Sequence, residues 1–226
     1  MDFKAGEIFA IDKPYRISSF GALAHVRYVL SRTLGYKVKI GHAGTLDPLA
    51  TGVLILCTGK ATKRIEEFQG QTKEYTATLQ LGATTASYDM EHEVNASFPT
   101  EHITRELIND TLPQFIGDIE QIPPTYSAVK VNGDRAYELR RAGEEVKLKP
   151  KHIHIDEIEV VDFDVEKMQL GLRVVCGKGT YIRALARDLG RALNSGAYLT
   201  ALRRTRVGDF TIDRCLDYEH IREWIE

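Results

Sequence analysis

The segment from Lys39 to Leu54, KIGHAGTLDPLATGVL, constrains this chain more than any other stretch, because it surrounds one acidic residue with residues that control the backbone. Asp47 is that acid, and Pro48 after it disfavours helical geometry at Asp47. Three glycines permit backbone angles and close approaches that a Cβ would forbid, namely Gly41, Gly44 and Gly52. We expect a loop that holds the Asp47 carboxylate in one pose before a buried strand, Val53 to Cys57. An ordinary Asp-Pro turn is the alternative.

The composition predicts a folded, intracellular protein. The chain has 226 residues, of which 43% are hydrophobic, enough for an ample core. Its three cysteines are odd in number and widely spaced, which argues against a disulfide framework and favours the reducing cytoplasm. No stretch has the length of a signal peptide core or of a membrane span, so we expect no membrane association.

Charge is distributed unevenly along the chain although the net charge is only −2. Residues 1 to 64 carry ten Lys and Arg against four Asp and Glu, and residues 178 to 206 carry seven against one. Residues 89 to 120 carry one against eight. If the basic segments share a face, that face can bind phosphates; ordinary solvated surface is the alternative.

Hydrophobic periodicity predicts interleaved helices and strands without a regular βαβ repeat, hence a mixed α/β or α+β fold. Ser18 or Ser19 can cap a helix whose apolar residues recur at helical spacing, namely Phe20, Leu23, Ala24, Val26, Val29 and Leu30. Strict alternation predicts half-buried strands at residues 75 to 81 and 170 to 176.

A second helix is predicted after the later strand, capped by Thr180 and running to about Leu193. Arginines recur at every fourth residue along it, as expected of a solvated or anion-facing row, namely Arg183, Arg187 and Arg191.

Six segments in order resemble one family. Besides the Asp47 segment they are IDKPYRISS, KEYTATLQLG, DIEQIPPTYSAVK, GKGTYIRALARDLG and ALRRTRVGDF. Together they cover almost the whole chain and are similar to the TruB family, the bacterial tRNA pseudouridine-55 synthases. The resemblance implies an α+β pseudouridine synthase fold, with a curved, mixed, mainly antiparallel sheet, flanking helices and a central RNA-binding cleft. It also implies a single catalytic domain, 1–226, without the C-terminal PUA domain of many family members.

The implied reaction breaks the N1–C1′ bond of uridine, rotates the base and rejoins it through C5. It involves no redox change or net hydrolysis, so no cofactor is expected, and a placed, ionised carboxylate suffices. The resemblance makes Asp47 the nucleophile, Arg183 the cation that keeps it charged, and Tyr75 the aromatic that stacks on the flipped base. Without the resemblance, Arg183 is an ordinary surface arginine and Tyr75 a core aromatic of its strand.

Four further residues match family positions near the bound uridine. His42 matches a histidine that displaces the base, Tyr181 and Leu202 match pocket-lining positions, and Lys13 matches a lysine near the site. Structural roles are the alternatives for His42, Leu202 and Lys13. The histidines are scattered, so no metal site is expected. Two residues depart from the pattern, since Arg16 and His92 stand where family members carry glycine.

The expected substrate is the T-arm stem-loop of tRNA, bound by a monomer that needs no obligate protein partner. Two other functions remain open. One is pseudouridine formation in a different structured RNA, and the other is a non-catalytic RNA-binding or tRNA-folding module, which would tolerate loss of Asp47.

Overall fold

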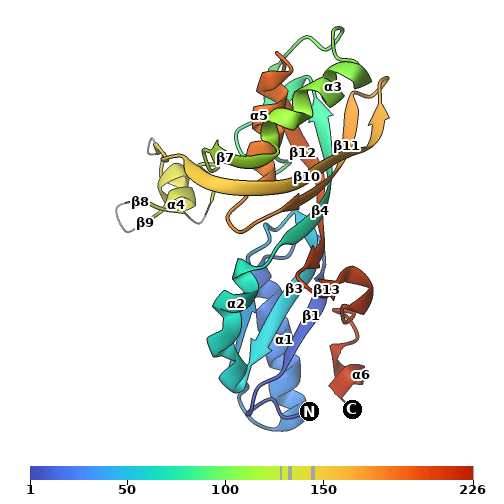
Figure 1. Ribbon diagram of the computed structural model, residues 1–226. Coiled ribbons are helices and arrows are strands. Elements are labelled where there is room, and N and C mark those ends of the chain that lie inside the picture. The colour runs from blue at the N-terminus through green and yellow to red at the C-terminus, as the bar shows by residue number, and fades with distance from the viewer. Residues whose placement is uncertain (128, 132–133, 144–145, 226) are drawn as a thin grey trace. The chain divides into compact units, whose positions relative to one another are not determined.

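The computed structural model describes residues 1–127, 129–131, 134–143 and 146–225 (Figure 1). The chain divides into two compact units, and each is described by itself. Unit 1 comprises Met1–Thr76 and Leu202–Glu226, and unit 2 comprises Ala77–Ala201. The single catalytic domain over 1–226 and the missing PUA domain stay predictions.

Unit 1 holds both ends of the chain. Its elements are β1 (Ile8–Lys13), α1 (Ser19–Leu34), β2 (Ile40–Ala43), β3 (Ala50–Thr58), the 3-10 helix η1 (Gly59–Arg64), α2 (Ile65–Gly70), the start of β4 (Lys73–Leu81), the end of β12 (Ala197–Val207), β13 (Phe210–Thr211), η3 (Ile212–Arg214) and α6 (Ile221–Ile225).

Strand β3 is central to unit 1. It pairs antiparallel with β1 and β2, and parallel with the end of β12. Gly52 of β3 lies opposite Lys13 of β1 on one side and Arg204 of β12 on the other, while Leu202 lies opposite Ala50. The sheet is therefore mixed, and β3 connects three segments that are far apart in the sequence.

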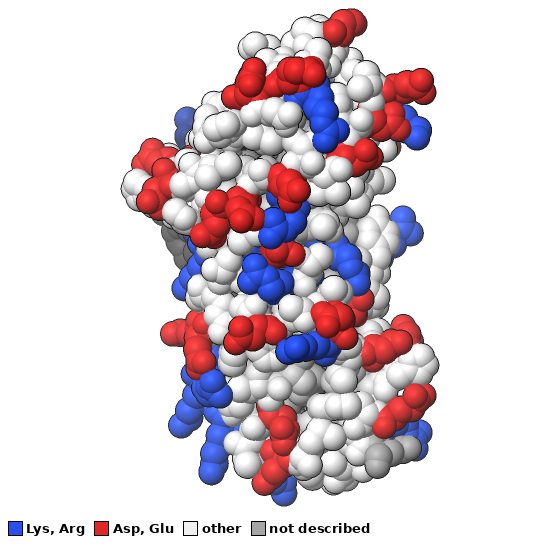
Figure 2. Space-filling model, turned by 45° about the vertical axis from the view of Figure 1, so that its right-hand side comes forward, with Lys and Arg blue, Asp and Glu red and all other residues white. Residues whose placement is uncertain are grey.

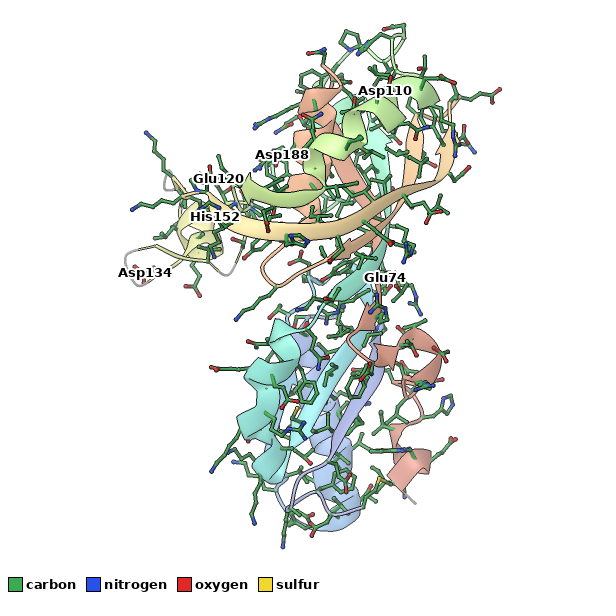
Figure 3. All side chains as sticks on the ribbon, in the orientation of Figure 1. Glu74, Asp110, Glu120, Asp134, His152 and Asp188 are labelled. Carbon is green, nitrogen blue, oxygen red and sulfur yellow. The ribbon has the colours of Figure 1, made fainter. Side chains whose placement is uncertain are left out.

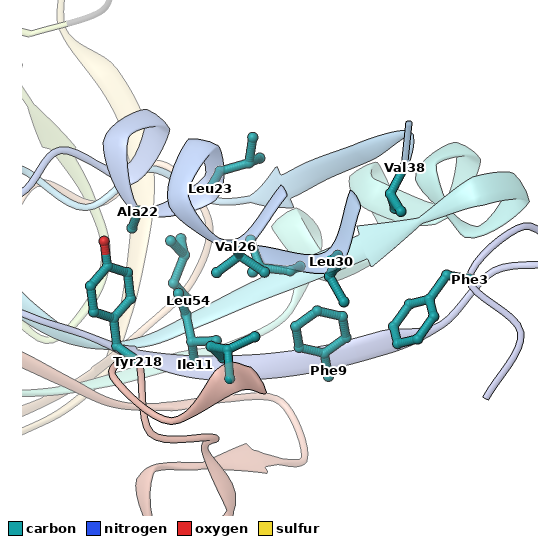
Figure 4. Packing of buried hydrophobic residues seen from close by; sticks show 12 residues of the cluster. Phe3, Phe9, Ile11, Ala22, Leu23, Val26, Leu30, Val38, Leu54 and Tyr218 are labelled. Carbon is teal, nitrogen blue, oxygen red and sulfur yellow. The ribbon is translucent and has the colours of Figure 1, made fainter. Parts of the chain in front are cut away.

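Two hydrophobic clusters form because side chains alternate along β1 and β3. Leu54 and Leu56 of β3 pack with Phe9 and Ile11 of β1 against helix α1 (Figure 4). The intervening residues of the two strands face the other cluster, which includes Phe68 of α2. Helices thus cover both faces of this sheet, which explains why the strand predicted at 53 to 57 is apolar at every position.

Helix α1 begins and ends as its sequence predicts, but one residue of its expected apolar stripe is exposed. The Ser18 hydroxyl accepts a hydrogen bond from the Gly21 amide (3.0 Å), and Gly35 ends the helix at φ 72°. The buried residues are Ser19, Ala22, Leu23, Val26 and Leu30. Phe20 is 66% exposed, so its place in the stripe was wrong. Helical spacing alone allowed a wider stripe than the sheet covers.

Unit 2 contains the remaining elements. They are the end of β4, β5 (Ala83–Thr85), β6 (Val94–Ser97), α3 (Arg105–Thr111), the 3-10 helix η2 (Leu112–Phe115), β7 (Gly117–Gln121), β8 (Lys130–Val131), β9 (Asp134–Arg135), α4 (Ala136–Arg141), β10 (Lys151–Asp164), β11 (Gln169–Cys176), α5 (Ile182–Ala192) and the start of β12.

The long, curved strand β10 pairs antiparallel with β7 along one part and with β11 along another (Figure 1). The predicted alternation is confirmed in β11 and β4, where Leu170, Leu172, Tyr75, Ala77 and Leu79 are buried. A mixed fold with a mixed sheet and flanking helices is therefore confirmed, whereas the central RNA-binding cleft stays a prediction.

Helix α5 differs from its prediction at its start. Tyr181, not Thr180, occupies the N-cap position, and it makes no side-chain capping hydrogen bond. The Thr180 hydroxyl is buried without a hydrogen-bond partner among the described residues. The helix ends at Ala192, as predicted to within one residue.

Two further predictions concerned a shared basic face and the absence of a membrane-spanning segment. Figure 2 shows one face of the molecule, on which Lys and Arg side chains are interspersed with Asp and Glu side chains. Basic and acidic residues are not separated on that face. Among the described residues, every helix is too short or too polar to cross a membrane.

Candidate active site

The Asp47 loop connects β2 to β3 and turns tightly around the acid. The Asp47 carbonyl oxygen accepts a hydrogen bond from the Ala50 amide (3.0 Å), and Gly44 adopts φ 83°. The side chain of Asp47 is half-buried, between the buried residues Leu46 and Ala50. The backbone-controlling residues therefore form a compact turn, as the sequence predicts.

Three side chains from distant segments hold this loop by its backbone. The Ser19 hydroxyl donates to the Leu46 carbonyl (2.9 Å) and accepts from the Leu46 amide (2.8 Å). The Arg204 guanidinium donates to the Gly44 carbonyl (3.0 Å). The Lys13 ammonium donates to the Pro48 carbonyl (3.5 Å). The anchors therefore lie at both residues next to Asp47 and at the glycine that opens the turn, which restrains the carboxylate.

Ser19→Ala is expected to destabilise the protein by about 1–3 kcal/mol, because it leaves the buried Leu46 amide and carbonyl without partners. Turnover is expected to fall about tenfold, because Asp47 follows Leu46 directly. Urea denaturation and single-turnover kinetics measure the two effects. Ser18→Ala is the matched control, since it removes the α1 cap without touching the loop; equal loss of turnover in both variants would contradict the anchoring role.

Arg204 is an anchor that sequence reasoning missed. It is 1% exposed, and its Nε donates to the Val53 carbonyl (2.8 Å). Within the described part of the chain it has no carboxylate within 4.0 Å, so backbone carbonyls satisfy this buried cation. The only signal for its burial was alternation along the strand 197–207, in which the neighbours Arg203 and Thr205 lie on the more exposed side. Arg203 pairs with Asp12 at 2.6 Å instead.

Lys13 is fully buried and brings a positive charge close to the loop. Its ammonium also donates to the carbonyls of Pro14 (2.9 Å) and Ile17 (2.6 Å). Burial lowers the pKa of Lys13 to about 8, and the negative charge of Asp47 opposes that decrease. The interaction is mutual, so a protonated Lys13 favours the ionised form of Asp47.

Turnover is expected to fall as pH rises through about 8, because deprotonated Lys13 loses its positive charge beside the Asp47 loop and donates less strongly to the Pro48 carbonyl that follows Asp47. Single-turnover rates between about pH 6 and pH 10 test this. Lys13→Arg keeps the charge throughout that range and should lack the decline. A decline of the same size in Lys13→Arg would assign it to another group.

His42, Leu202 and Tyr75 also belong to unit 1. His42 lies in β2, and its buried Nδ1 has no hydrogen-bond partner among the described residues. Burial, with a smaller contribution from Arg204, lowers the pKa of His42, which favours a neutral imidazole. Leu202 is half-buried opposite Ala50, at the end of the Asp47 loop. The structure thus brings His42, Leu202 and Lys13 to the segments around Asp47.

Tyr75 is 8% exposed on the buried side of β4. The preceding Glu74, labelled in Figure 3, accepts a hydrogen bond from Thr205 of β12 (2.9 Å). Burial agrees with a core aromatic, while the stacking role of Tyr75 remains a proposal.

Arg183 and Tyr181 belong to unit 2. Arg183 is 5% exposed and donates to the carbonyls of Ser87 (3.1 Å) and Tyr126 (2.9 Å), with Asp89 at 3.7 Å from its Nε. Arg187 is 6% exposed and pairs with Asp188, which Figure 3 labels. Of the two alternatives for the arginine row, the solvated one was therefore wrong for both residues. Only Arg191 of that row is exposed.

The backbone of Tyr181 is held by Gln121, which sequence reasoning missed. The Gln121 side-chain oxygen accepts from the Tyr181 amide (2.9 Å), and its nitrogen donates to the Tyr181 carbonyl (3.2 Å). Gln121 is 2% exposed, and no sequence pattern distinguished it from other strand residues.

The two departures from the family pattern have structural explanations. Arg16 adopts φ 64°, the left-handed conformation that glycine favours, so the turn forms despite the substitution. His92 packs its ring against Tyr126, with centroids 4.5 Å apart.

Comparison with known proteins identifies the family of this chain. Residues 31–182 match the TruB family pseudouridylate synthase (N terminal domain), and residues 183–226 match the tRNA pseudouridylate synthase B C-terminal domain. The chain is 62% identical to the tRNA pseudouridine synthase B of Bacteroides thetaiotaomicron, over 100% of this chain and 95% of that protein. It is 61% identical to the protein of the same name from Phocaeicola vulgatus, over 100% and 96%.

A solved structure is also similar. A Cbf5-Nop10-Gar1 complex contains a chain that is 28% identical and superposes with a TM-score of 0.72 over 99% of this chain. This chain spans 56% of the length of that one. Two family matches together extend from residue 31 to residue 226, and the two relatives are about 60% identical over at least 95% of their length. The chain belongs to the TruB family of pseudouridylate synthases.

Proposed function

We propose that the chain is a tRNA pseudouridine synthase, an isomerase that converts the T-loop uridine at tRNA position 55 into pseudouridine. The identity of 62% to a tRNA pseudouridine synthase B, over the whole of this chain, carries the proposal. The Asp47 loop supports it, because its backbone is held by Ser19, Arg204 and Lys13. Such restraint suits a carboxylate that must meet one atom of a flipped nucleotide.

Asp47 supplies the chemistry in this proposal. Its carboxylate either attacks the uridine covalently or takes a proton from the ribose, and either route requires the ionised form. Lys13 favours that form from within the fold. We assign to Arg183 the role of the cation that pairs with Asp47 during the reaction. The reaction isomerises the nucleotide without net oxidation or hydrolysis, so its atom balance calls for no cofactor.

The remaining residues bind the target nucleotide in this proposal. A neutral His42 can occupy the space that the flipped base leaves in the RNA stack, since an uncharged ring stacks with little desolvation cost. We assign to Tyr75, Tyr181 and Leu202 contacts with the flipped uridine. A flipped base needs such apolar and aromatic surfaces against its faces.

Mapping of pseudouridine on an unmodified tRNA transcript tests the function. Purified protein is incubated with the transcript without added cofactor, and pseudouridine is located at single-nucleotide resolution. Conversion confined to the T-loop uridine is expected, and a transcript with cytidine at that position should stay unmodified. Conversion only at other sites, or in another RNA class alone, would overturn the tRNA assignment, whereas absence of conversion would favour a binding or folding module.

We further propose that the enzyme acts as a monomer in the cytoplasm, where unmodified tRNA is available, and without an obligate protein partner. Activity of the purified chain on a transcript, with a monomeric mass by light scattering, would support this. Activity that appears only after a cell extract is added would contradict it.

A further inference from the structure

A basic groove lies in unit 1, at the end of the core cluster shown in Figure 4. Phe3 and Val38, both 2% exposed, lie at that end of the cluster and form the floor of the groove. Its volume is about 330 Å³. Five lysines line it, namely Lys4, Lys37, Lys39, Lys60 and Lys63. All five are exposed, and among the residues that the structure describes no acidic side chain lines this lysine groove.

Close backbone packing holds together the three segments that carry the lysines of the groove. Their proximity is therefore fixed by the fold. Gly59 adopts φ 48°, its amide donates to the Lys39 carbonyl (2.9 Å), and a Cβ on it would overlap the Lys4 carbonyl oxygen. A Cβ on Gly6 would likewise lie 2.5 Å from the Ala61 nitrogen. These contacts join the N-terminal turn, the segment before β2 and η1 into one surface.

The five lysines are uncompensated within the described residues, where none has a carboxylate within 4.0 Å. Of the acids near them in the sequence, Asp2, Glu7 and Glu67 have other partners, Glu67 pairing with Arg64 at 2.8 Å, and Glu66 forms no ion pair within 4.0 Å with a described residue. The Asp2 carboxylate accepts from the Lys4 and Ala5 amides, and the Glu7 carboxylate accepts from the Asp2 amide. Several like charges without counter-charges repel one another and favour an anionic ligand.

The lining of the groove indicates which anion fits. Phe3 is buried, and the Lys4 ammonium lies 4.3 Å from the centre of the Tyr36 ring, so neither aromatic residue offers a free face for a base. Single-stranded nucleic acid is usually bound by such faces, whereas duplex RNA is contacted mainly at its phosphates and riboses. The floor also exposes too little apolar surface for a protein partner.

We propose that the lysine groove binds backbone phosphates of the double-helical stem that carries the target loop. The inference rests on the proposed function. Strand β2 leads directly from Lys39 to His42, a distance of about 10 Å at the usual rise of an extended strand. A stem attached to a loop whose uridine lies near His42 therefore passes within reach of the groove. The lysines supply affinity that is independent of base sequence.

The salt dependence of RNA binding tests the groove. A Lys37→Gln, Lys60→Gln, Lys63→Gln triple variant removes three exposed charges outside the Asp47 loop. Its dissociation constant for a T-arm stem-loop RNA should be at least about tenfold weaker than wild type at low salt, and the slope of log K against log salt should fall by about 2–3. Single-turnover kcat at saturating RNA should stay within about twofold.

The matched control loses the same charge elsewhere. Arg105→Gln, Lys167→Gln, Arg191→Gln changes three exposed basic residues of unit 2 and should leave the slope within about 1 of wild type. Equal slopes for both triple variants would overturn the proposal. A second RNA, the loop without its stem, should bind wild type and groove variant equally. A loss of the same size with the loop alone would overturn the assignment to the stem.

Binding and turnover are measured separately, which distinguishes the two proposals. If wild type forms no pseudouridine in any RNA, the proposed function fails, while the salt slope for stem-loop binding still decides the role of the groove. If turnover is normal and the slopes are equal, the function stands and the groove proposal alone fails.

Discussion

Asp47→Asn is expected to lower turnover on tRNA by at least about 10³-fold, because the amide can neither attack the nucleotide nor accept its proton. The dissociation constant for RNA is expected to stay within about threefold of wild type. The amide has nearly the same shape as the carboxylate, and the loop is held through its backbone at Gly44, Leu46 and Pro48 rather than through Asp47 alone. Single-turnover product formation and equilibrium binding give the two quantities.

Asp209→Asn is the matched control, since it makes the same chemical change at an exposed position of unit 1 and should leave turnover unchanged. Loss of binding in step with loss of turnover in Asp47→Asn would contradict a chemical role and indicate that Asp47 shapes the loop. A turnover rate close to that of wild type would mean that another residue acts as the nucleophile or base.

Gly52→Ala is expected to destabilise the protein by more than about 4 kcal/mol, beyond the usual range of single substitutions. Gly52 has φ 106°, and a Cβ there would overlap the Arg204 carbonyl oxygen and lie 2.8 Å from the Arg204 nitrogen. These atoms belong to the backbone of a paired strand, so they cannot move aside as a flexible side chain could. Because Lys13 lies opposite Gly52 on the other side, two loop anchors would shift together.

Gly35→Ala separates the steric effect from the backbone effect. Gly35 also has a positive φ, 72°, but a Cβ there meets nothing within 4 Å. Its replacement should cost only about 1 kcal/mol, the strain of the left-handed conformation. Urea denaturation of both variants measures the difference. Similar losses of unfolding free energy would mean that β3 and β12 can separate to admit the methyl group.

Local patterns determined much of the fold. Alternation placed β4 and β11, because one face of each strand is buried and the period of two is unambiguous. Helical spacing and a capping serine placed α1. The same spacing overestimated the apolar stripe at Phe20, since a helix pattern does not state how wide its partner surface is.

The candidate site was predicted only in part. The glycines and Pro48 indicated a constrained loop at Asp47, and the loop is tight. The residues that hold Tyr181 and the Asp47 loop, Gln121, Ser19 and Arg204, were not predicted in those roles. Their partners are backbone carbonyls and amides, which every residue has, so the partner positions leave no pattern in the sequence.

What the sequence by itself determined was the family and the tight loop at Asp47, since these depend on residue types at fixed spacing, while the chemistry of Asp47 stays a prediction. What only the tertiary structure decided was which charged side chains are buried. Arg183 was an ordinary surface arginine without the family resemblance, yet it, Arg204 and Lys13 are all buried, and each donates to a carbonyl of a distant segment. The physical reason is that burial of a charge depends on the acceptors that surround it in space, and the chain folds those acceptors into place from positions up to 160 residues away.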